Sequence, residues 1–536
     1  MPIRPARLLL LISLSLLTAL VCIPAPAQPS GSEDILTMIE AGDFRKADAA
    51  IAQKLASDTT LSPAKRLDLA FEQDRMYRIR KDFTKTESEV RAYVKKWIPE
   101  ATDTDFQRWE ASGALEMMRI DGEKRYFNSA ARNLFRIDTA ARAIWRDKHR
   151  DEPEEPGLAS EKGLDRHIQD VMSTAVKSKQ QFVKPVRLRI AYTITVDADA
   201  IPAGETIRCW IPFPREIPGR QKDIRMVSTD PQAHLIADNA RFLQRTAYVE
   251  KTAAASQKTV FTAEYEYTSH GVYVPVEASR VQPVGSRPDL EPFLREEPPH
   301  IQFTPALRSL SAQIVGQEQN PLLIARALFA WVDSHVPWAS AREYSTVRSL
   351  SDYAFTNRHG DCGMQTMLFV TLLRMNGIPA RWQSGWEFRP PSSSMHDWGM
   401  VYFEPYGWVP MDATYGRRVS EDEAMKFFYV NGMDSYRLIF NDAVGAPFYP
   451  AKIHPRSETV DSQRGEVEWR GGNLYFDKWD WDMEWKVLSE GGRESACGIG
   501  AAPHNTCGSN ERNSRPSEPR GAAQQLRKQR TVVMAM

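Results

Sequence analysis

The sequence has little cysteine, no excess of charge of either sign and only one long apolar run. Five Cys occur in 536 residues, and 69 Lys and Arg balance 69 Asp and Glu. A chain without net charge offers no basic surface for nucleic acid or for an anionic membrane. It also lacks a phosphate-binding glycine loop, a calcium-binding loop and the paired Cys or His spacings of a zinc site, so we expect no cofactor and no metal.

The remaining composition is that of a globular protein. Hydrophobic residues make up 42% of the chain and charged residues 26%, both near the average for globular domains. Its length allows two to four domains at roughly 100–200 residues each. The one apolar run, residues 8–21, has 14 residues, fewer than the roughly 20 that a membrane-spanning helix needs.

This apolar run has the features of an export signal. Arg4 and Arg7 precede it, and Ala25-Pro26-Ala27 follows with the small residues that a signal peptidase reads. We therefore expect residues 1–27 to be a signal peptide and the mature protein to be secreted, periplasmic or extracellular, with no stable membrane insertion.

The spacing of apolar residues changes along the chain. Residues 28–180 repeat them at helical spacing and predict a helical domain, whereas residues 181–295 alternate apolar and polar side chains between turns and predict a β-sandwich-like domain. Residues 300–490 predict helices followed by strands, the expected catalytic domain. Residues 491–536 are rich in Gly, Ser, Asn and Arg and predict a disordered tail. The helical domain shows no chemistry, and packing, binding a protein partner and acting as a pro-segment all stay open.

One thiol stands at the start of a predicted helix. Cys362 follows Asp361, a suitable N-cap, and apolar residues at helical spacing continue to Met375. Free N–H groups and the positive end of the helix dipole stabilise a thiolate, so we expect a lowered thiol pKa and part of an oxyanion hole. The structural alternative is a Cys that packs at the start of a core helix.

The other cysteines have simpler interpretations. Cys209 fits a buried strand residue, while Cys497 and Cys507 either form a disulfide or remain free.

A histidine and an aspartate follow on separate predicted strands. His396 opens a strand beside an exposed loop at residues 389–394, and Asp412 lies on the next strand. Nucleophilic thiol catalysis needs such an imidazole and a carboxylate that orients it. A simple hairpin places Asp412 opposite Met400, so contact with His396 requires a bulge, an offset or strong twist. Asp397 is the rival orienter, although adjacent strand residues point to opposite faces.

These segments together resemble the transglutaminase-like core, over about residues 321–418. The resemblance rests on Gly360-Asp361-Cys362 before a helix, Gly377-Ile378-Pro379-Ala380-Arg381, His396 before Trp398, and Gly407-Trp408 leading to Asp412. It implies a papain-like arrangement of a helix against an antiparallel sheet. By position, it also implies Cys362 as the nucleophile, His396 as general base and acid, and Asp412 as the group that orients the imidazole.

The resemblance extends to the oxyanion hole and to the reaction. In that family an upstream Trp, Tyr or Gln commonly completes the oxyanion hole, and Tyr344 and Trp338 are the candidates here, Tyr344 being preferred. We expect an α+β multidomain, exported cysteine hydrolase that acts on amide bonds of a protein or peptide as a peptidase, amidase or deamidase. The alternatives are a cross-linking protein-glutamine transglutaminase and a non-catalytic binding or scaffold protein.

Overall fold

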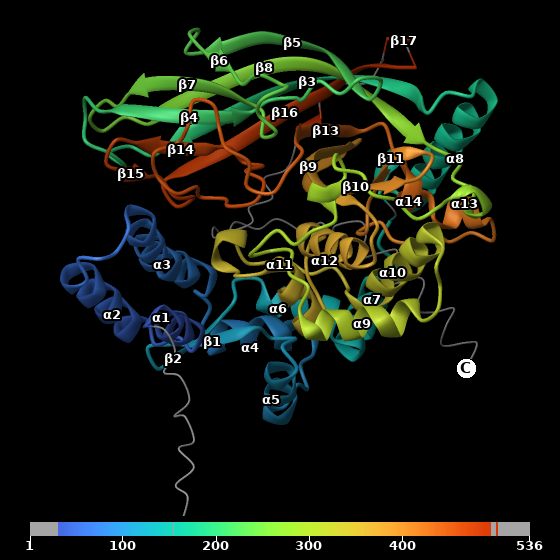
Figure 1. The fold of residues 1–536 in the computed structure, drawn as a ribbon. Helices are drawn as coiled ribbons and strands as arrows, with labels where there is room; N and C mark the ends of the chain where they lie inside the picture. The colour runs from blue at the N-terminus through green and yellow to red at the C-terminus, as the bar shows by residue number, and fades with distance from the viewer. Residues whose placement is uncertain (1–30, 154, 492, 495–499, 502–536) are drawn as a thin grey trace, which may run out of the picture.

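A computed structural model describes residues 31–153, 155–491, 493–494 and 500–501. The expected signal peptide and most of the expected disordered tail, with Cys497 and Cys507, lie outside the described residues. The described chain is a mixed structure of helices and several antiparallel sheets, with a helical region at its N-terminus (Figure 1).

The N-terminal helical region has its own apolar core. Its elements are α1 (Gly31–Glu40), α2 (Phe44–Ser57), α3 (Pro63–Asp82), α4 (Glu87–Trp97), α5 (Asp103–Ala111), the hairpin β1 (Met117–Ile120) and β2 (Glu123–Tyr126), α6 (Ala130–Ile137) and α7 (Thr139–Lys148). Two helix starts are fixed by reciprocal capping, Thr86 with Glu89 and Thr102 with Asp105. Buried apolar residues between Ile35 and Ala141 form one cluster.

Two antiparallel sheets form the middle of the molecule. They are built from β3 (Phe182–Val196), β4 (Thr206–Pro212), β5 (Gln221–Asp230), β6 (Leu235–Ile236), β7 (Thr246–Thr252), β8 (Thr259–Tyr273), β12 (Gly432–Met433), β14 (Glu466–Trp469), β15 (Gly472–Asn473), β16 (Trp479–Glu490) and β17 (Arg493–Glu494). The strand orders are β12-β8-β3-β16-β17, with β5 beside β8, and β15-β14-β4-β7-β6. Their inward side chains share one apolar core, which includes Cys209.

The last strands of the chain complete these sheets. Strand β16 pairs with β3 from Trp479–Val196 to Glu490–Val186, and β14 pairs with β4. Figure 1 shows both C-terminal strands lying beside strands from the first half of the chain. The sequence analysis assigned residues 466–490 to the expected catalytic domain, 300–490. In the structure they pair with strands of the segment before it, residues 181–295.

Glu266 on β8 is a buried carboxylate that joins three arginines of the larger sheet. It is 3% exposed and accepts hydrogen bonds from Arg187 Nη2 at 2.8 Å, Arg189 Nε at 2.7 Å and Arg225 Nη2 at 3.0 Å. Burial alone would raise its pKa, but the three guanidinium groups lower it to about 2. Because its folded pKa is depressed, Glu266 stabilises the fold above the unfolded pKa, and that stability is lost as pH falls toward about 2.

We expect Glu266→Gln to lower the free energy of unfolding by about 1–3 kcal/mol near neutral pH. The difference from wild type should shrink as pH falls from about 4.5 to about 2, which urea unfolding across that range measures. Glu264→Gln, on the same strand but more exposed, is the matched control and should have a smaller effect. A deficit that stays constant with pH would show that ionisation of Glu266 is not involved.

The segment expected to be catalytic is a helical layer on a four-stranded antiparallel sheet. Its elements are α9 (Pro305–Val315), α10 (Pro321–His335), η4 (Tyr344–Thr346), α11 (Leu350–Asn357), α12 (Cys362–Met375), β9 (Ala380–Arg389), β10 (Ser392–Phe403), β11 (Gly407–Met411), α13 (Glu423–Lys426), α14 (Phe428–Asn431) and β13 (Arg437–Asn441). The sheet order is β11-β10-β9-β13, and α12 packs against β9 and β10.

The β9–β10 hairpin is longer than expected. Residues 389–394, expected to be an exposed loop, include Ser392–Ser394, which pair with β9 at Glu387–Arg389. The turn is reduced to Pro390 and Pro391, because the three Ser residues adopt the extended conformation and continue the hydrogen-bonded pairing with β9. His396 therefore lies inside a paired strand and is buried, not at the edge of a loop.

The helical region packs directly on the segment around η4. Asp82 Oδ2 at the end of α3 accepts hydrogen bonds from Glu343 N at 3.2 Å and Thr346 Oγ1 at 2.8 Å. Asn133 on α6 exchanges two hydrogen bonds with the backbone of Ser340, at 2.9 and 3.0 Å. These contacts fix η4 itself and the residues that lead into it.

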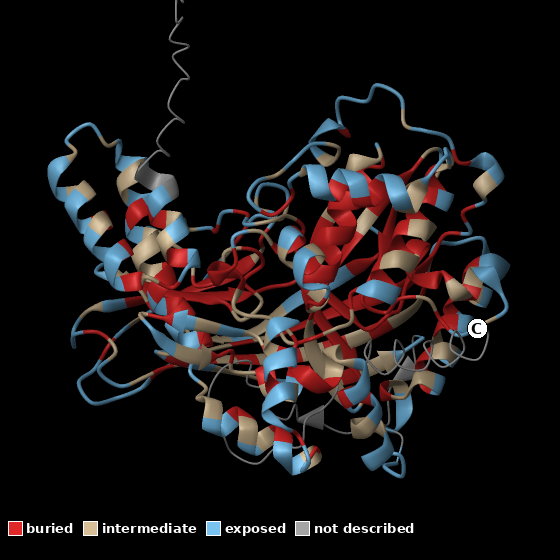
Figure 2. Ribbon diagram, turned by 90° about the horizontal axis from the view of Figure 1, so that it is seen from below, coloured by how far each residue is buried: buried red, intermediate tan, exposed pale blue. Residues whose placement is uncertain are grey.

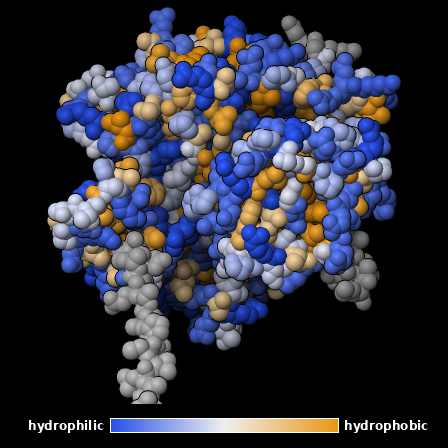
Figure 3. All heavy atoms as spheres, viewed as in Figure 1, coloured by the Kyte–Doolittle hydropathy of each residue, from blue (hydrophilic) through white to orange (hydrophobic). Residues whose placement is uncertain are grey.

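Burial follows this layered arrangement. Buried residues concentrate where helices meet sheets, and the outward faces of the helices are exposed (Figure 2). The face in Figure 3 is mainly hydrophilic, with small apolar groups scattered over it. Within the described ranges, no helix combines the length and apolar character needed to cross a bilayer.

Candidate active site

Cys362 is the first residue of α12 and is partly exposed. Asp361 caps this helix, since its Oδ1 accepts a hydrogen bond from Met364 N at 3.1 Å. The side chains that follow are almost all buried, which anchors the helix in the core. Gly363 permits a close approach at this point, because a Cβ there would lie 2.0 Å from the Tyr344 hydroxyl.

His396 and Asp412 are in direct contact. His396 Nε2 lies 2.8 Å from Asp412 Oδ2, and both side chains are buried. The hairpin is offset from the simple one, since Met400 pairs with Pro410 and Gly399 with Met411. Asp412 therefore follows the last pair, two residues nearer to His396 than expected, and its Oδ1 accepts a hydrogen bond from Thr414 N at 3.1 Å.

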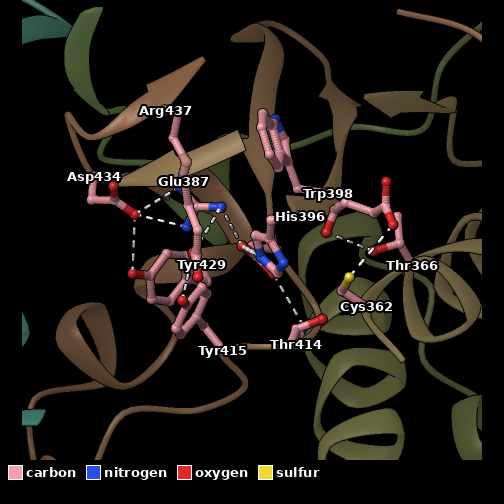
Figure 4. A network of polar contacts seen from close by, with 12 residues as sticks. Cys362, Thr366, Glu387, His396, Trp398, Thr414, Tyr415, Tyr429, Asp434 and Arg437 are labelled. Atoms are coloured by element: carbon pink, nitrogen blue, oxygen red, sulfur yellow. Dashed lines mark hydrogen bonds and ion pairs between the residues drawn. The ribbon is translucent and has the colours of Figure 1, made fainter. Parts of the chain in front are cut away.

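A buried arginine that the sequence analysis missed holds Asp412. Arg437 Nη1 lies 3.0 Å from Asp412 Oδ2, and Nη2 lies 2.7 Å from Asp434 Oδ2. Burial alone would raise the pKa of Asp434, but the Arg437 guanidinium holds it well below its usual range. In Figure 4 the His396 ring lies between Arg437 and Cys362. The sequence signal that could have marked Arg437 is its position as a charged residue directly before the apolar strand residues Leu438-Ile439-Phe440.

The Cys362 thiol contacts a different carboxyl group. Its Sγ lies 3.4 Å from Asp397 Oδ2, and no hydrogen bond joins Cys362 to His396 among the residues the structure describes. Burial raises the pKa of the thiol, and the Asp397 and Asp361 carboxyl groups raise it further when they are ionised. The lowered pKa expected from the helix terminus alone is therefore wrong for this arrangement, because that reasoning omitted the carboxyl groups.

The two oxyanion-hole candidates lie in different surroundings. The Tyr344 hydroxyl is 2.9 Å from both Asp361 oxygens and 3.1 Å from Asp397 Oδ2, so it reaches the surroundings of the thiol. Trp338 pairs through its backbone with Gly360, and the guanidinium carbon of Arg136 lies 4.8 Å from the centroid of its ring. The structure thus places Tyr344 beside the residues that contact Cys362 and places the Trp338 ring beside α6.

The sequence was also compared with known proteins. No curated protein matches it. Among solved structures, a candidate cysteine protease from Cytophaga hutchinsonii is 16% identical with a TM-score of 0.40, covering 57% of this chain and 93% of its own. The periplasmic domain of TgpA from Pseudomonas aeruginosa is 14% identical with a TM-score of 0.23, covering 47% of this chain and 98% of its own.

A family model locates the site within a known superfamily. The model described as "Transglutaminase-like superfamily" matches residues 308–413. This range begins in α9 and ends directly after Asp412, so it contains Cys362 and His396 as well. Residues 308–413 of this chain are a transglutaminase-like domain.

Proposed function

We propose that this protein is an exported cysteine hydrolase that cleaves amide bonds in a protein or peptide. Cys362 is its nucleophile, His396 its general base and acid, and Asp412 the group that orients His396, in a papain-like core beside a β-sandwich. The observation that carries the proposal is the 2.8 Å contact between His396 Nε2 and Asp412 Oδ2. This contact leaves Nδ1 of the same ring for proton exchange with a thiol.

The reaction begins when the Cys362 thiol, which lies 3.4 Å from Asp397 Oδ2, comes within hydrogen-bond distance of His396 Nδ1. The thiol proton passes to His396 Nδ1, and the thiolate attacks the amide carbonyl carbon. A carbon–sulfur bond forms while the carbonyl π electrons move to oxygen. As this intermediate collapses, the carbon–nitrogen bond breaks, and the imidazolium gives its proton to the leaving amine. The product of this half-reaction is a thioester on Cys362.

Water completes the cycle. His396 takes a proton from water, the hydroxide oxygen attacks the thioester carbon, and the carbon–sulfur bond breaks to return the thiolate. We assign stabilisation of the oxyanion to the free N–H groups in the first turn of α12. The Tyr344 hydroxyl is a second donor once it releases Asp361 or Asp397, and Trp338 is a candidate for substrate contact.

Hydrolysis and cross-linking differ in the second half-reaction. An amine that reaches the thioester in place of water would give a cross-link, as in the transglutaminase alternative. Incubating a glutamine-containing peptide with a labelled primary amine separates the two, because hydrolysis leaves an acid and cross-linking incorporates the label. A binding or scaffold protein would turn over neither, and it would have no chemical need for the His396–Asp412 pair.

The pH dependence of iodoacetamide labelling at Cys362 tests the proposed pair. We expect His396→Ala to raise the pH midpoint of labelling by about one unit or more, because it removes the base that stabilises the thiolate as an ion pair. Labelling is read at the Cys362 peptide by mass spectrometry, where Cys362→Ser should abolish it, and the buried Cys209 should not react. Identical midpoints in wild type and His396→Ala would refute the pair and favour the scaffold alternative.

A further inference from the structure

A cluster of three buried carboxyl groups includes the acidic neighbours of the thiol. Asp397 Oδ2 lies 3.4 Å from Cys362 Sγ, and Asp361 lies beside Asp397 through the shared Tyr344 hydroxyl. Asp461, the third, acts on Asp397 through its charge; Asp397 is 1% exposed and Asp461 is 2% exposed. Among the described residues, no Lys, Arg or His forms an ion pair with Asp397, whose carboxyl oxygens contact Cys362, Tyr344 and Gln463.

The two carboxyl groups that flank the catalytic pair therefore differ in charge compensation. Asp412 contacts both His396 and the guanidinium group of Arg437, so a counter-charge lies beside it although it is buried. Asp397 has neutral or acidic partners, and a buried carboxylate without a counter-charge is strongly disfavoured. Two buried carboxyl groups whose charges act on each other also cannot both ionise easily, so one of Asp397 and Asp461 keeps a proton.

The surrounding charges indicate which member of the pair keeps the proton. Burial raises the pKa of Asp461, and the Arg456 and Arg464 guanidinium groups offset part of that rise. For Asp397, burial comes first and the Asp461 and Asp361 charges act in the same direction, so its pKa lies well above the usual range. The negative charge of the pair is thus best placed on Asp461, and the proton on Asp397.

Hydrogen bonding indicates the oxygen that carries this proton. Asp397 Oδ1 accepts from Gln463 Nε2 at 2.8 Å, so it is already an acceptor. Oδ2 faces Cys362 Sγ at 3.4 Å and the Tyr344 hydroxyl at 3.1 Å. We propose that Asp397 is a further catalytic residue, a neutral carboxylic acid whose Oδ2–H donates a hydrogen bond to the Cys362 thiolate when His396 takes the thiol proton.

This assignment rests on the proposed function and explains how a thiolate forms beside three carboxyl groups. A neutral Asp397 adds no charge, and its donor stabilises the sulfur during the step that creates negative charge. An ionised Asp397 would repel the thiolate instead. Since burial raises the pKa of Asp361 to about 7, the acid cluster as a whole loses protons as pH rises, which opposes thiolate formation on the alkaline side.

Two substitutions at Asp397 separate a neutral donor from a charged acceptor. Asn keeps an acceptor for Gln463 and places an N–H donor where Oδ2–H lies, whereas Ala removes the donor. We expect Asp397→Asn to leave the midpoint of Cys362 labelling within about 0.3 pH units of wild type, and Asp397→Ala to raise it by about one unit, a tenfold slower labelling at neutral pH. If both substitutions lower the midpoint, Asp397 carries charge and the proposal is wrong. It is equally wrong if neither changes the midpoint.

An infrared difference spectrum between wild type and Asp397→Asn gives a second reading that needs only the isosteric variant. A carboxylic acid C=O band at neutral pH that is lost in Asp397→Asn supports the proposal, and the absence of this band overturns it. The spectrum reports the charge of Asp397 in the resting protein. It therefore stays informative if His396→Ala leaves labelling unchanged, the result that would refute the proposed function itself.

Discussion

Replacing Arg437 by Met is expected to lower the free energy of unfolding by about 3–5 kcal/mol, the usual cost of removing one partner of a buried ion pair. Arg437 is completely buried and lies between Asp412 and Asp434. The apolar Met side chain has similar length but provides no charge, so both carboxylates lose a cation without a large change in packing. Urea unfolding of the two proteins near neutral pH measures the loss.

The same substitution is expected to reduce kcat/KM by about a hundredfold or more, in line with the loss of an ionised orienting carboxylate in a catalytic triad. Without Arg437, the buried Asp412 carboxylate loses the guanidinium group that holds it in place, so it orients the His396 ring less firmly. Steady-state kinetics with a peptide substrate measures the loss, which should fall mainly on kcat.

Two variants control for general damage at this position. Arg437→Lys keeps a positive charge but cannot reach both carboxylates in the same way, so its losses should be intermediate. Asp434→Asn leaves the Arg437–Asp412 contact in place and should lower stability more than it lowers kcat/KM. If Arg437→Met retained wild-type stability and wild-type kcat/KM, Arg437 would not be holding Asp412 in place.

Deleting residues 31–150 is expected to reduce activity by about a hundredfold or more. The contacts of α3 and α6 hold η4, which carries Tyr344, and the residues that lead into it; a displaced η4 disturbs the site that positions the sulfur. Arg78 also donates to Ser457 O at 3.0 Å from a fully buried position. These contacts favour an integral role over the pro-segment that domain order alone left open.

A single substitution tests the same interface without removing a domain. Asp82→Ala leaves Glu343 N and Thr346 Oγ1 without their acceptor and should cost about 1–3 kcal/mol, whereas Asp82→Asn keeps an acceptor and should cost less. Peptide turnover and thermal unfolding of the three proteins measure both effects. A deletion variant that is folded and more active than the full chain would instead establish the helical region as an occluding pro-segment.

The start of α12 could be predicted because its signals are local. An Asp N-cap, a following apolar pattern and an Asn-Gly end lie within one stretch, and the helix runs from Cys362 to Met375 as this pattern indicates. The spacing of His396 and Asp412 was also readable from strand and turn residues. Their contact was not, because it depends on the hairpin offset at Gly407.

Other parts of the site depend on partners far away in the sequence. Arg437 comes from β13, which joins the sheet beside β9, and nothing near it in the sequence marks Asp412 as its partner. Asp397 was considered only as an orienter of His396, whereas the structure turns it toward Cys362 on the other face of the strand. Alternation along a strand predicts that the His396 and Asp397 side chains point to opposite faces. It does not predict that Asp397 contacts Cys362.

The return of β16 to β3 also has a consequence for the order of folding. Strand β3 ends at residue 196, but its neighbour begins at residue 479. A chain still emerging from the ribosome therefore carries β3 with one edge unpaired until the whole catalytic segment has been made. Such an open edge is a template for pairing with other chains, so β3 stays open to aggregation until residues 479–490 have been made and can cover it.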